Sequence, residues 1–310
     1  MKHFKKKKKY VIIGVYALKP AFDLRKYSRF SLQMPFAFSK NSSIGCGGQA
    51  TVAFYPKDVV ELTALIQQLT QDGTRYCVLG NLTNVLPPDG VADFAVVCMK
   101  GLDGIVVGEG VFVQAGVTSG ALLRACKAAK RGGAEFLSGI PCTLGGALYM
   151  NAGAGDKYIS EIVESVTVLR EGKRRILSLK DCEYAYKHSV FMENGDIILG
   201  ATLRFEKATE EEIAKNEEYY LSKRLHLPKG KSMGCVFKNP PSAFAGDLIE
   251  RSGLKGFRIG GAKISEEHAN FIINDRNALS SDVKALIAVA KNAVRSQYGV
   301  RLEEEIRYLE

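Results

Sequence analysis

The stretch FLSGIPCTLGGALYMNAGAGD, at positions 136–156, contains five glycines. Glycine has no Cβ, so the backbone N–H groups of such a segment can approach a ligand without interference from side chains. A glycine-rich loop with a purely structural role is the alternative, and the stretch alone leaves both interpretations open. The loop follows TSGALLRACKAAKRGG (118–133), which predicts a helix capped by Thr118 and stopped at Gly132-Gly133.

The segments before this loop show the same succession of strand, helix and loop. TVAFYP (51–56) alternates like a strand, and Asp58 follows as the cap of a predicted helix with one apolar face. RYCVLG (75–80) predicts the next strand. It ends in GNLTNVLPPDG (80–90), a cluster of turn formers where open α/β sheets place ligand loops. The apolar face of the helix consists of Val59, Leu62, Leu65, Ile66 and Leu69.

The segments after the loop are strand-like and then helical. VESVTVLREGKRRILSL (163–179) predicts a hairpin around Glu171-Gly172, and DIILGATLRF (196–205) predicts another strand. A polar helix at 208–228 is expected to connect two subdomains. A third unit follows it and closes with a capped helix at 280–299.

The final segment, VRLEEEIRYL (300–309), predicts a strand with two unlike faces. Glu305 lies on the polar face, between arginines. From the pattern alone, a solvated edge strand is the favoured interpretation of that face. The apolar face consists of Val300, Leu302, Ile306 and Tyr308.

Length and composition predict a folded chain of two or three subdomains, because 310 residues with 46% hydrophobic content can bury a large core. The net charge is +10, but Lys2 and Lys5 to Lys9 supply six charges and leave only +4 for the rest. That lysine run predicts a solvated tail, with an arm for nucleic acid or anionic lipid as the weaker alternative. A signal peptide is disfavoured because the apolar stretch at 10–18 is short and no Ala-x-Ala site follows it.

Seven cysteines make an odd number with irregular spacing, no Cys-x-x-Cys and no paired histidines. This pattern predicts no metal site and a reduced, cytoplasmic setting. No apolar run approaches the roughly 20 residues that cross a bilayer, and the body lacks the basic and aromatic interleaving of a nucleic-acid binder. We therefore expect neither a membrane nor a nucleic-acid partner.

Four segments together are specific to one family. They are SGIPCTLGGALYMNAGAG (138–155), GCVFKNP (234–240), GGAKISEEHANFIIN (260–274) and YGVRLEEEIRYL (298–309), in this order. With them, the chain resembles the UDP-N-acetylenolpyruvoylglucosamine reductases, which are flavoenzymes of peptidoglycan precursor synthesis also called UDP-N-acetylmuramate dehydrogenases. The resemblance extends from about residue 35 to residue 309.

The resemblance implies an α+β fold of the vanillyl-alcohol-oxidase (PCMH) type. It implies FAD-binding lobes at 34–100 and 101–207, a substrate-binding lobe at 208–299 and a C-terminal strand at 300–310, after a flexible extension at 1–33. The interval between residues 189–191 and the strand at 196–205 is too short for an inserted substrate-covering loop, so the compact form is expected. Because Met34 directly precedes the resemblance, we also hypothesise that translation starts there.

In this family NADPH reduces FAD, and the flavin passes hydride to the enolpyruvyl group of UDP-N-acetylglucosamine enolpyruvate, giving UDP-N-acetylmuramate. The resemblance implies the same cofactors and substrate here, and we expect a monomer. Hydride at the alkene carbon distal to the carboxylate leaves an enolate-like intermediate, so the site needs cations and a proton donor. Cys235 occupies the position of the family's proton-donating serine, and a thiol can also donate a proton at neutral pH.

The other implied site residues follow from the same motifs. Glu305 matches the catalytic glutamate, and Lys187 stands where the family has an arginine that polarises the substrate carboxylate. Contacts with substrate are implied for Tyr186, Lys238, Asn239, His268 and Asn270. Contacts with FAD are implied for Gly47, Gly48, Gly80, Asn81, Thr83, Asn84, Gly139, Ile140, Pro141, Thr143, Gly145, Gly146 and Ala147.

Several positions depart from the family pattern. Lysine at 187 keeps the charge of arginine but loses its planar, two-pronged donor. The usual Gly-Ser-Asn of the phosphate loop is Leu82-Thr83-Asn84 here, and Gly155 replaces a tyrosine that touches substrate. The Lys/Arg-Gln-Pro element appears as His226-Leu227-Pro228. A divergent but working enzyme is the favoured interpretation, and a paralogue with a changed substrate is the alternative.

Three further alternatives stay open at this point. A flavin oxidoreductase of the same fold could attach its flavin covalently through His188 or Cys142. A weakened protein could bind a nucleotide sugar or flavin without turnover. A Rossmann dehydrogenase is suggested by IGCGGQA (44–50), but those glycines precede the first clear strand and do not lead from it into a helix.

Overall fold

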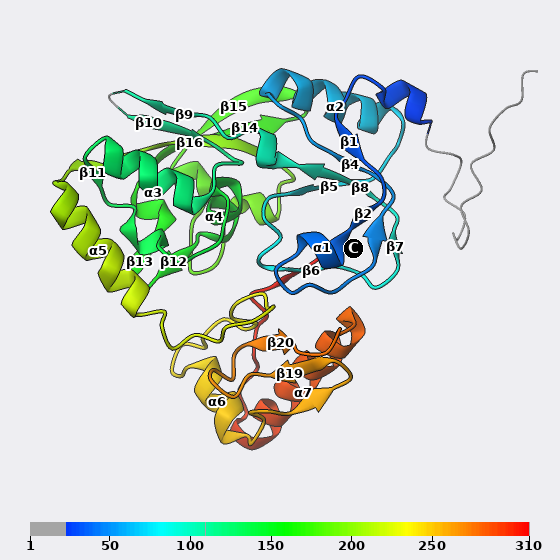
Figure 1. The fold of residues 1–310 in the computed structure, drawn as a ribbon, viewed down its shortest axis with the longest axis vertical. Helices are drawn as coiled ribbons and strands as arrows, with labels where there is room; N and C mark the ends of the chain where they lie inside the picture. The colour runs from blue at the N-terminus through cyan, green and yellow to red at the C-terminus, as the bar shows by residue number, and fades with distance from the viewer. Residues whose placement is uncertain (1–22, 109, 310) are drawn as a thin grey trace, which may run out of the picture.

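Two sheets form the upper part of the molecule as drawn in Figure 1. The computed structural model describes residues 23–108 and 110–309. One sheet has the strand order β1-β4-β8-β5 and is parallel except for β1, whereas the other, β15-β14-β16-β10-β9, is antiparallel throughout. The bounds of these strands are Leu32–Gln33 (β1), Ala53–Phe54 (β4), Tyr76–Leu79 (β5), Ala95–Cys98 (β8), Ile105–Val107 (β9), Val111–Gln114 (β10), Val163–Arg170 (β14), Lys173–Ser178 (β15) and Ile197–Leu203 (β16).

Short sheets connect the remaining segments. One consists of β2 (Phe36–Ala37), β3 (Gln49–Ala50) and β7 (Val91–Ala92), and another, in the lower part of Figure 1, of β18 (Arg258–Ile259), β19 (Ala262–Ile264) and β20 (Ile272–Asn274). The pairs are β11 (Arg131–Gly132) with β17 (Glu206–Lys207), β12 (Gly153–Ala154) with β13 (Lys157–Tyr158), and β6 (Val85–Leu86) with β21 (Arg307–Tyr308).

The helices cover these sheets. The α-helices are α1 (Phe38–Asn41), α2 (Val59–Gln71), α3 (Ser119–Ala128), α4 (Leu144–Met150), α5 (Glu210–Ser222), α6 (Ala245–Arg251) and α7 (Ser280–Tyr298). Single 3-10 turns lie at Leu24–Tyr27, Met99–Gly101, Glu135–Leu137, Ile159–Glu161, Lys180–Cys182 and Val190–Met192. Among the described residues, no helix is long and apolar enough to cross a membrane.

Local sequence signals set the predicted elements. The carboxylate of Asp58 accepts a hydrogen bond from the N–H of Glu61, and the predicted apolar face of α2 is buried except at its partly buried first residue. The Glu171-Gly172 hairpin is confirmed, with both residues at positive φ, as a two-residue turn between twisted strands requires. Helix α3 ends at Ala128, before the predicted glycine stop, because the backbone turns left-handed at Lys130.

The two lobes expected at 34–100 and 101–207 share one hydrophobic core. Phe54 and Leu62 from the first segment belong to the same buried cluster as Val113, Leu148 and Val166 from the second. A smaller cluster around Phe38 and Val96 lies within the first segment. Residue 100 therefore does not separate two lobes with independent hydrophobic cores.

Residues 23–33 are part of this core, so the expectation of a flexible extension to residue 33 is wrong for them; residues 1–22, with the lysine run, lie outside the described residues. Tyr27 is 1% exposed, and its ring centroid lies 5.2 Å from that of Phe54. Phe30 is buried beside them, and β1 pairs with β4. A translation start at Met34 stays a hypothesis, and such a start would remove these buried side chains.

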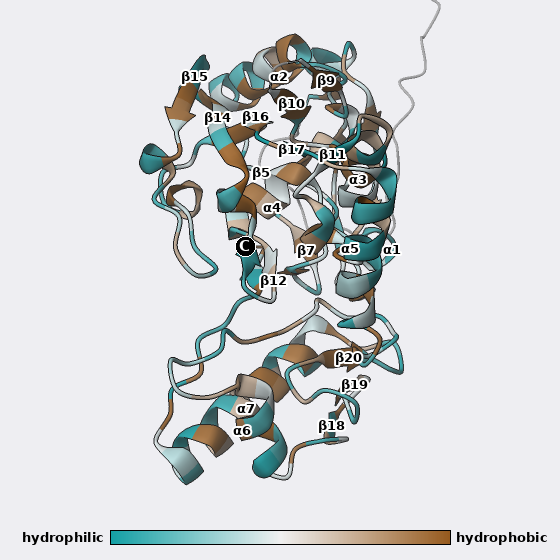
Figure 2. Ribbon diagram, turned by 90° about the vertical axis from the view of Figure 1, so that its left-hand side faces the viewer, coloured by the Kyte–Doolittle hydropathy of each residue, from teal (hydrophilic) through white to brown (hydrophobic). Residues whose placement is uncertain are grey.

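The third unit is a separate body in the lower part of Figure 2, with its own core under α7. Its expected start at residue 208 is wrong, because α5 packs against α3 and Glu135–Leu137 of the upper part and buries only Ile213 there. Figure 2 colours most of α5 as hydrophilic, which fits a helix with one buried contact. The buried residues of the third core begin at Met233, apart from three contributed by the first segment.

The C-terminal segment crosses from the third unit back to the upper part, as its red trace in Figure 1 shows. Among residues 300–309, only Arg307–Tyr308 form a strand, and Glu304 adds an isolated bridge to Phe237. The expected strand over 300–310 is therefore too long. The predicted alternation nevertheless holds at Leu302 and Ile306, which are buried, while the arginines are exposed.

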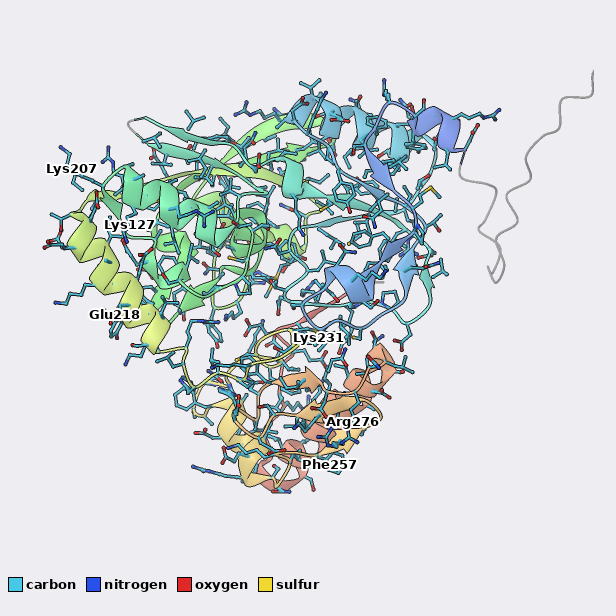
Figure 3. All side chains as sticks on the ribbon, viewed as in Figure 1. Lys127, Lys207, Glu218, Lys231, Phe257 and Arg276 are labelled. Carbon is cyan, nitrogen blue, oxygen red and sulfur yellow. The ribbon has the colours of Figure 1, made fainter. Side chains whose placement is uncertain are left out.

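Hydrogen bonds help to hold the junction between the two parts. Lys231, labelled in Figure 3, lies there, and its carbonyl accepts a hydrogen bond from the N–H of Asn274. The Asn274 amide group donates to the carbonyls of Ile44 and Gly45 in the first segment. A Cβ at Gly45 would come 2.7 Å from the Lys231 side chain, so the chains pass closely at this point.

Removing residues 2–33 is expected to lower the free energy of unfolding by several kcal/mol relative to removing residues 2–22. The shorter chain loses Tyr27 and Phe30, and truncating a buried aromatic side chain costs about 3–5 kcal/mol. Urea unfolding of the two purified proteins measures the difference. Equal midpoints would contradict the packing described for residues 23–33.

Candidate active site

A cavity of about 1210 Å³ lies where the three units meet. It exceeds the roughly 300–1,000 Å³ of an ordinary small-molecule site, so it can take a dinucleotide and a second ligand. The following residues predicted for the site line it: Gly80, Asn81, Thr83, Asn84, Gly139, Ile140, Pro141, Thr143, Gly145, Gly146, Tyr186, Lys187, Cys235, Asn239, Asn270 and Glu305.

The loop after β5 carries backbone donors into the cavity. The N–H groups of residues 81–84 donate no hydrogen bond to any described residue. Leu82 has φ +51°, and a left-handed residue in such a loop turns successive N–H groups toward one side, which makes a concavity for an anion. This loop therefore fits a phosphate of the FAD that the family motifs imply.

Leucine at position 82 incurs a conformational free-energy cost that the family's glycine would not incur. A left-handed conformation costs a non-glycine residue roughly 1–2 kcal/mol. The Leu82 side chain is 4% exposed and packs in the cluster of Phe38 and Val96, so its burial offsets that cost. Leu82 thus adopts a left-handed conformation that glycine would adopt without strain.

The glycine-rich loop forms the neighbouring wall. Gly139 has φ +74°, a conformation that favours glycine. The side-chain hydroxyl of Thr143 accepts a hydrogen bond from the N–H of Gly146, and a Cβ at Gly80 would come 2.2 Å from that hydroxyl. The amide group of Asn81 donates to the carbonyl of Pro141. Close packing of the two loops depends on these small residues.

Backbone pairing with the segment around Asn270 holds Cys235 in place. It forms an isolated bridge with Phe271, and the N–H of Val236 donates to the carbonyl of Asn270. The Asn270 side chain, 3% exposed, accepts from the Phe237 N–H at 2.9 Å and donates to the Phe237 carbonyl at 2.8 Å. The Asn270 side chain therefore forms the pair of hydrogen bonds with Phe237 that a neighbouring strand would form, and it fixes the segment beside Cys235.

Glu305 is tied to all three units. Its N–H donates to the carbonyl of Val236, and its carbonyl accepts from the side-chain amide of Asn84 at 3.1 Å. The carboxylate pairs with Lys187, with 2.8 Å between Nζ and Oε1. Both side chains are mostly buried, at 18% exposure for Lys187 and 13% for Glu305. The ion pair therefore closes the site across the junction.

A tight turn presents Tyr186 and Lys187. Ala185 and His188 exchange two backbone hydrogen bonds, and Lys187 adopts φ +53° between them. The hydroxyl of Tyr186 accepts a hydrogen bond from the N–H of Asn239 in the third unit. The turn thus places an aromatic ring and a cation in the cavity at the cost of one strained residue.

The charges around Cys235 shift its acidity. Burial, with a smaller contribution from the Glu305 carboxylate, raises the pKa of Cys235 to about 11, while Lys187 and Arg224 act in the opposite direction. Burial works to lower the pKa of Lys187, but the Glu305 carboxylate more than offsets it and the pKa is raised. At neutral pH the thiol is therefore protonated and the lysine charged.

Five predicted residues do not line the cavity. Gly47 and Gly48 pack against residues 87–90, where a Cβ at Gly48 would meet backbone oxygen atoms. Ala147 is 1% exposed in the core, and the mostly buried Lys238 side chain pairs with the exposed Glu303. His268 packs against Phe271 and accepts a hydrogen bond from the Asn270 N–H. The structure gives these residues roles in packing and positioning.

Other residues line the cavity without having been predicted. Tyr158 does so, and its ring lies edge-on to Tyr186 with 6.5 Å between centroids, three positions after the glycine that replaces the family's tyrosine. Arg224 and Ser43 also line it, and the Ser43 hydroxyl donates to the carbonyl of Ser232 at 2.6 Å. No local signal marks Arg224 or Ser43, because long-range packing brings them in.

Comparisons with known proteins agree with this geometry. The family model described as UDP-N-acetylenolpyruvoylglucosamine reductase, C-terminal domain, matches residues 226–309, and the one described as FAD binding domain matches residues 50–178. The UDP-N-acetylenolpyruvoylglucosamine reductase of Thermotoga petrophila is 40% identical over 275 residues, 86% of this chain and 95% of the relative. The chain belongs to the UDP-N-acetylenolpyruvoylglucosamine reductase family.

Further relatives support the family membership over nearly the whole chain. The reductase of Caldanaerobacter subterraneus is 37% identical over 292 residues, 92% of this chain and 95% of the relative. The crystal structure of the reductase from Thermus caldophilus is 30% identical, with a TM-score of 0.78 over 91% of this chain and 99% of that chain. The predicted α+β, FAD-binding fold is confirmed, and the Rossmann alternative is excluded.

The variant Asn270→Ala is expected to lower the free energy of unfolding by about 2–4 kcal/mol, because it leaves the buried N–H and carbonyl of Phe237 without partners. Turnover should fall as well, since the segment that carries Cys235 loses its support. Chemical unfolding and a turnover assay on the same preparation measure both effects. The variant Asn239→Ala serves as the comparison, because Asn239 is more exposed than Asn270. If Asn270→Ala is as stable as the unchanged protein, Asn270 does not have the positioning role.

Proposed function

We propose that this chain reduces UDP-N-acetylglucosamine enolpyruvate to UDP-N-acetylmuramate, with FAD as cofactor and NADPH as hydride donor. The observation that carries the proposal is that Cys235, Lys187 and Glu305 line the same cavity as the free N–H groups of residues 81–84. The family relatives named for this reaction are similar over most of their length, which supports it further.

The reaction sets two requirements on the chain. FAD, when bound by the loops at 80–84 and 139–146, supplies the chemistry of hydride transfer from NADPH to the substrate. Addition of hydride to the alkene carbon distal to the carboxylate moves the π electrons toward the carboxylate. The chain must then stabilise that negative charge and protonate the neighbouring carbon.

Cys235 is the proposed general acid. The thiol gives its proton to the alkene carbon next to the carboxylate and becomes a thiolate, which solvent then reprotonates. The pKa of about 11 that results from burial keeps the thiol protonated at neutral pH. The positive charges of Lys187 and Arg224 oppose the effect of burial on this pKa, so they also stabilise the thiolate once it forms.

Lys187 and Glu305 are proposed to act as a pair. Lys187 presents its ammonium to the charge that develops on the substrate. Glu305, 2.8 Å away, holds that ammonium in place and balances its charge within the mostly buried site. Tyr186 and Asn239, which touch each other across the junction, are proposed to contact the nucleotide sugar beside this pair.

We further propose that the protein works as a monomer in the cytoplasm. All seven cysteines are free, which suits a reducing compartment. The cavity is lined by residues of a single chain, so the proposed chemistry needs no second copy.

The variant Cys235→Ala is expected to lower the rate of substrate-dependent NADPH oxidation by about 10²- to 10⁴-fold, the usual contribution of a general acid. Cys235→Ser should keep activity, because the hydroxyl also carries a proton at this position. Absorbance of NADPH follows the steady-state rate, and mass spectrometry identifies the product.

The variant Cys126→Ala is the matched control, because Cys126 is buried in the core and does not line the cavity. Its turnover should equal that of the unchanged protein. If Cys235→Ala retains turnover within about threefold, Cys235 is not the general acid.

The pH dependence gives an independent test of the same thiol. A raised pKa means that the protonated form persists to higher pH, so the turnover number should stay level from pH 7 to about 9.5 and fall only as pH approaches the pKa of about 11. A fall centred near pH 8.5, the pKa of an unperturbed thiol, would contradict the buried environment of Cys235. The alkaline fall due to this group should be absent from Cys235→Ser.

A further inference from the structure

The cavity contains a cation without a counter-charge. Two carboxylates line it: Asp196, which accepts two hydrogen bonds from Arg170 at 2.7 Å, and Glu305, which pairs with Lys187. The guanidinium of Arg224 also lines the cavity, and it makes no hydrogen bond or ion pair with any described side chain.

The position of Arg224 is fixed by the backbone around it. Its N–H donates to the carbonyl of Leu221 at the end of α5, and its own carbonyl accepts from Leu227. A Cβ added at Gly139 would come 3.0 Å from Cδ and 3.1 Å from Nε of Arg224. The arginine stem therefore lies over the glycine-rich loop, and glycine at 139 makes room for it.

The guanidinium lines the same cavity as the reacting groups. Its charge acts on the pKa of Cys235 and on that of Cys142, two of the three cysteines that line the cavity. Burial lowers the pKa of Arg224 itself, which is the effect of a charge partly removed from water without an anion beside it. An uncompensated, partly buried charge is costly, and an anionic ligand would remove that cost.

Lys187 cannot fill this role alone. Its ammonium is already paired with Glu305, and a lysine lacks the planar fork with which arginine binds both oxygens of a carboxylate. We propose that Arg224 binds the carboxylate of the enolpyruvyl substrate and supplies the two-pronged donor that Lys187 does not provide.

This assignment rests on the proposed function and extends it to a residue outside the predicted set. The carboxylate is the anion adjacent to the carbon that Cys235 protonates, and Arg224 is the unpaired cavity cation that acts on Cys235. With its carboxylate held there, negative charge that develops during hydride addition lies between Arg224 and Lys187. The remaining cavity cations, Lys229 and Arg307, are exposed.

The test is an anaerobic single turnover. The bound flavin is reduced with dithionite, which makes the assay independent of NADPH, and reoxidation is followed at increasing concentrations of UDP-N-acetylglucosamine enolpyruvate. Arg224→Met should raise the half-saturating concentration by roughly 10- to 100-fold, as expected for loss of a charge-assisted hydrogen bond. Arg224→Lys should recover only part of this loss, because it restores the charge without the fork.

UDP-N-acetylglucosamine, which has no carboxylate, is the discriminating probe. Its affinity should be the same for Arg224→Met and the unchanged protein. Equal losses of affinity for both ligands would assign Arg224 to the diphosphate and overturn the proposal. A variant that binds less FAD but has unchanged affinity for both ligands would overturn it as well. Lys223→Met is the control, because Lys223 is exposed and does not line the cavity, and its saturation curve should be unchanged.

Failure of this proposal is distinguishable from failure of the proposed function. If the unchanged protein reoxidises with substrate and Arg224→Met has the same saturation curve, Arg224 does not bind the carboxylate and the reductase function stands. If the unchanged protein does not reoxidise at all, the function itself is wrong and the assignment of Arg224 is lost with it.

Discussion

The ion pair between Lys187 and Glu305 is the contact on which the arrangement of the site depends. Lys187 comes from a strained turn of the upper part, whereas Glu305 lies five residues before the last residue of the sequence and reaches the same point from the third unit. The 2.8 Å contact requires the junction to be closed, with β21 beside β6 and the Asn84 side chain on the Glu305 carbonyl. The cavity thus acquires its reactive end only when all three units are docked.

The charges in the cavity follow from this arrangement. Pairing with Glu305 keeps Lys187 charged in spite of burial, and burial raises the pKa of Cys235 so that its thiol stays uncharged. Arg224 remains as the partly buried positive charge that makes no ion pair with a described residue. A site whose lining holds more cations than carboxylates suits a reaction in which an anionic substrate passes through an enolate.

Sequence reasoning succeeded where the signal was local or shared with the family. The caps at Asp58 and Thr118 and the hairpin at Glu171-Gly172 are set by neighbouring residues, and the motif around Cys235 carries the family signature. It failed where distant segments meet. The burial of Tyr27, the packing of α5 on the upper part and the entry of Arg224 into the cavity have no periodic or motif signal, because each depends on contacts far apart in sequence.

The most direct test of the account uses the unchanged protein with its flavin reduced by NADPH under anaerobic conditions. Addition of UDP-N-acetylglucosamine enolpyruvate should restore the visible absorbance of oxidised flavin within the time of one turnover and yield UDP-N-acetylmuramate. Flavin that stays reduced in the presence of this substrate would contradict the reductase function and show that the altered positions have changed what the cavity accepts.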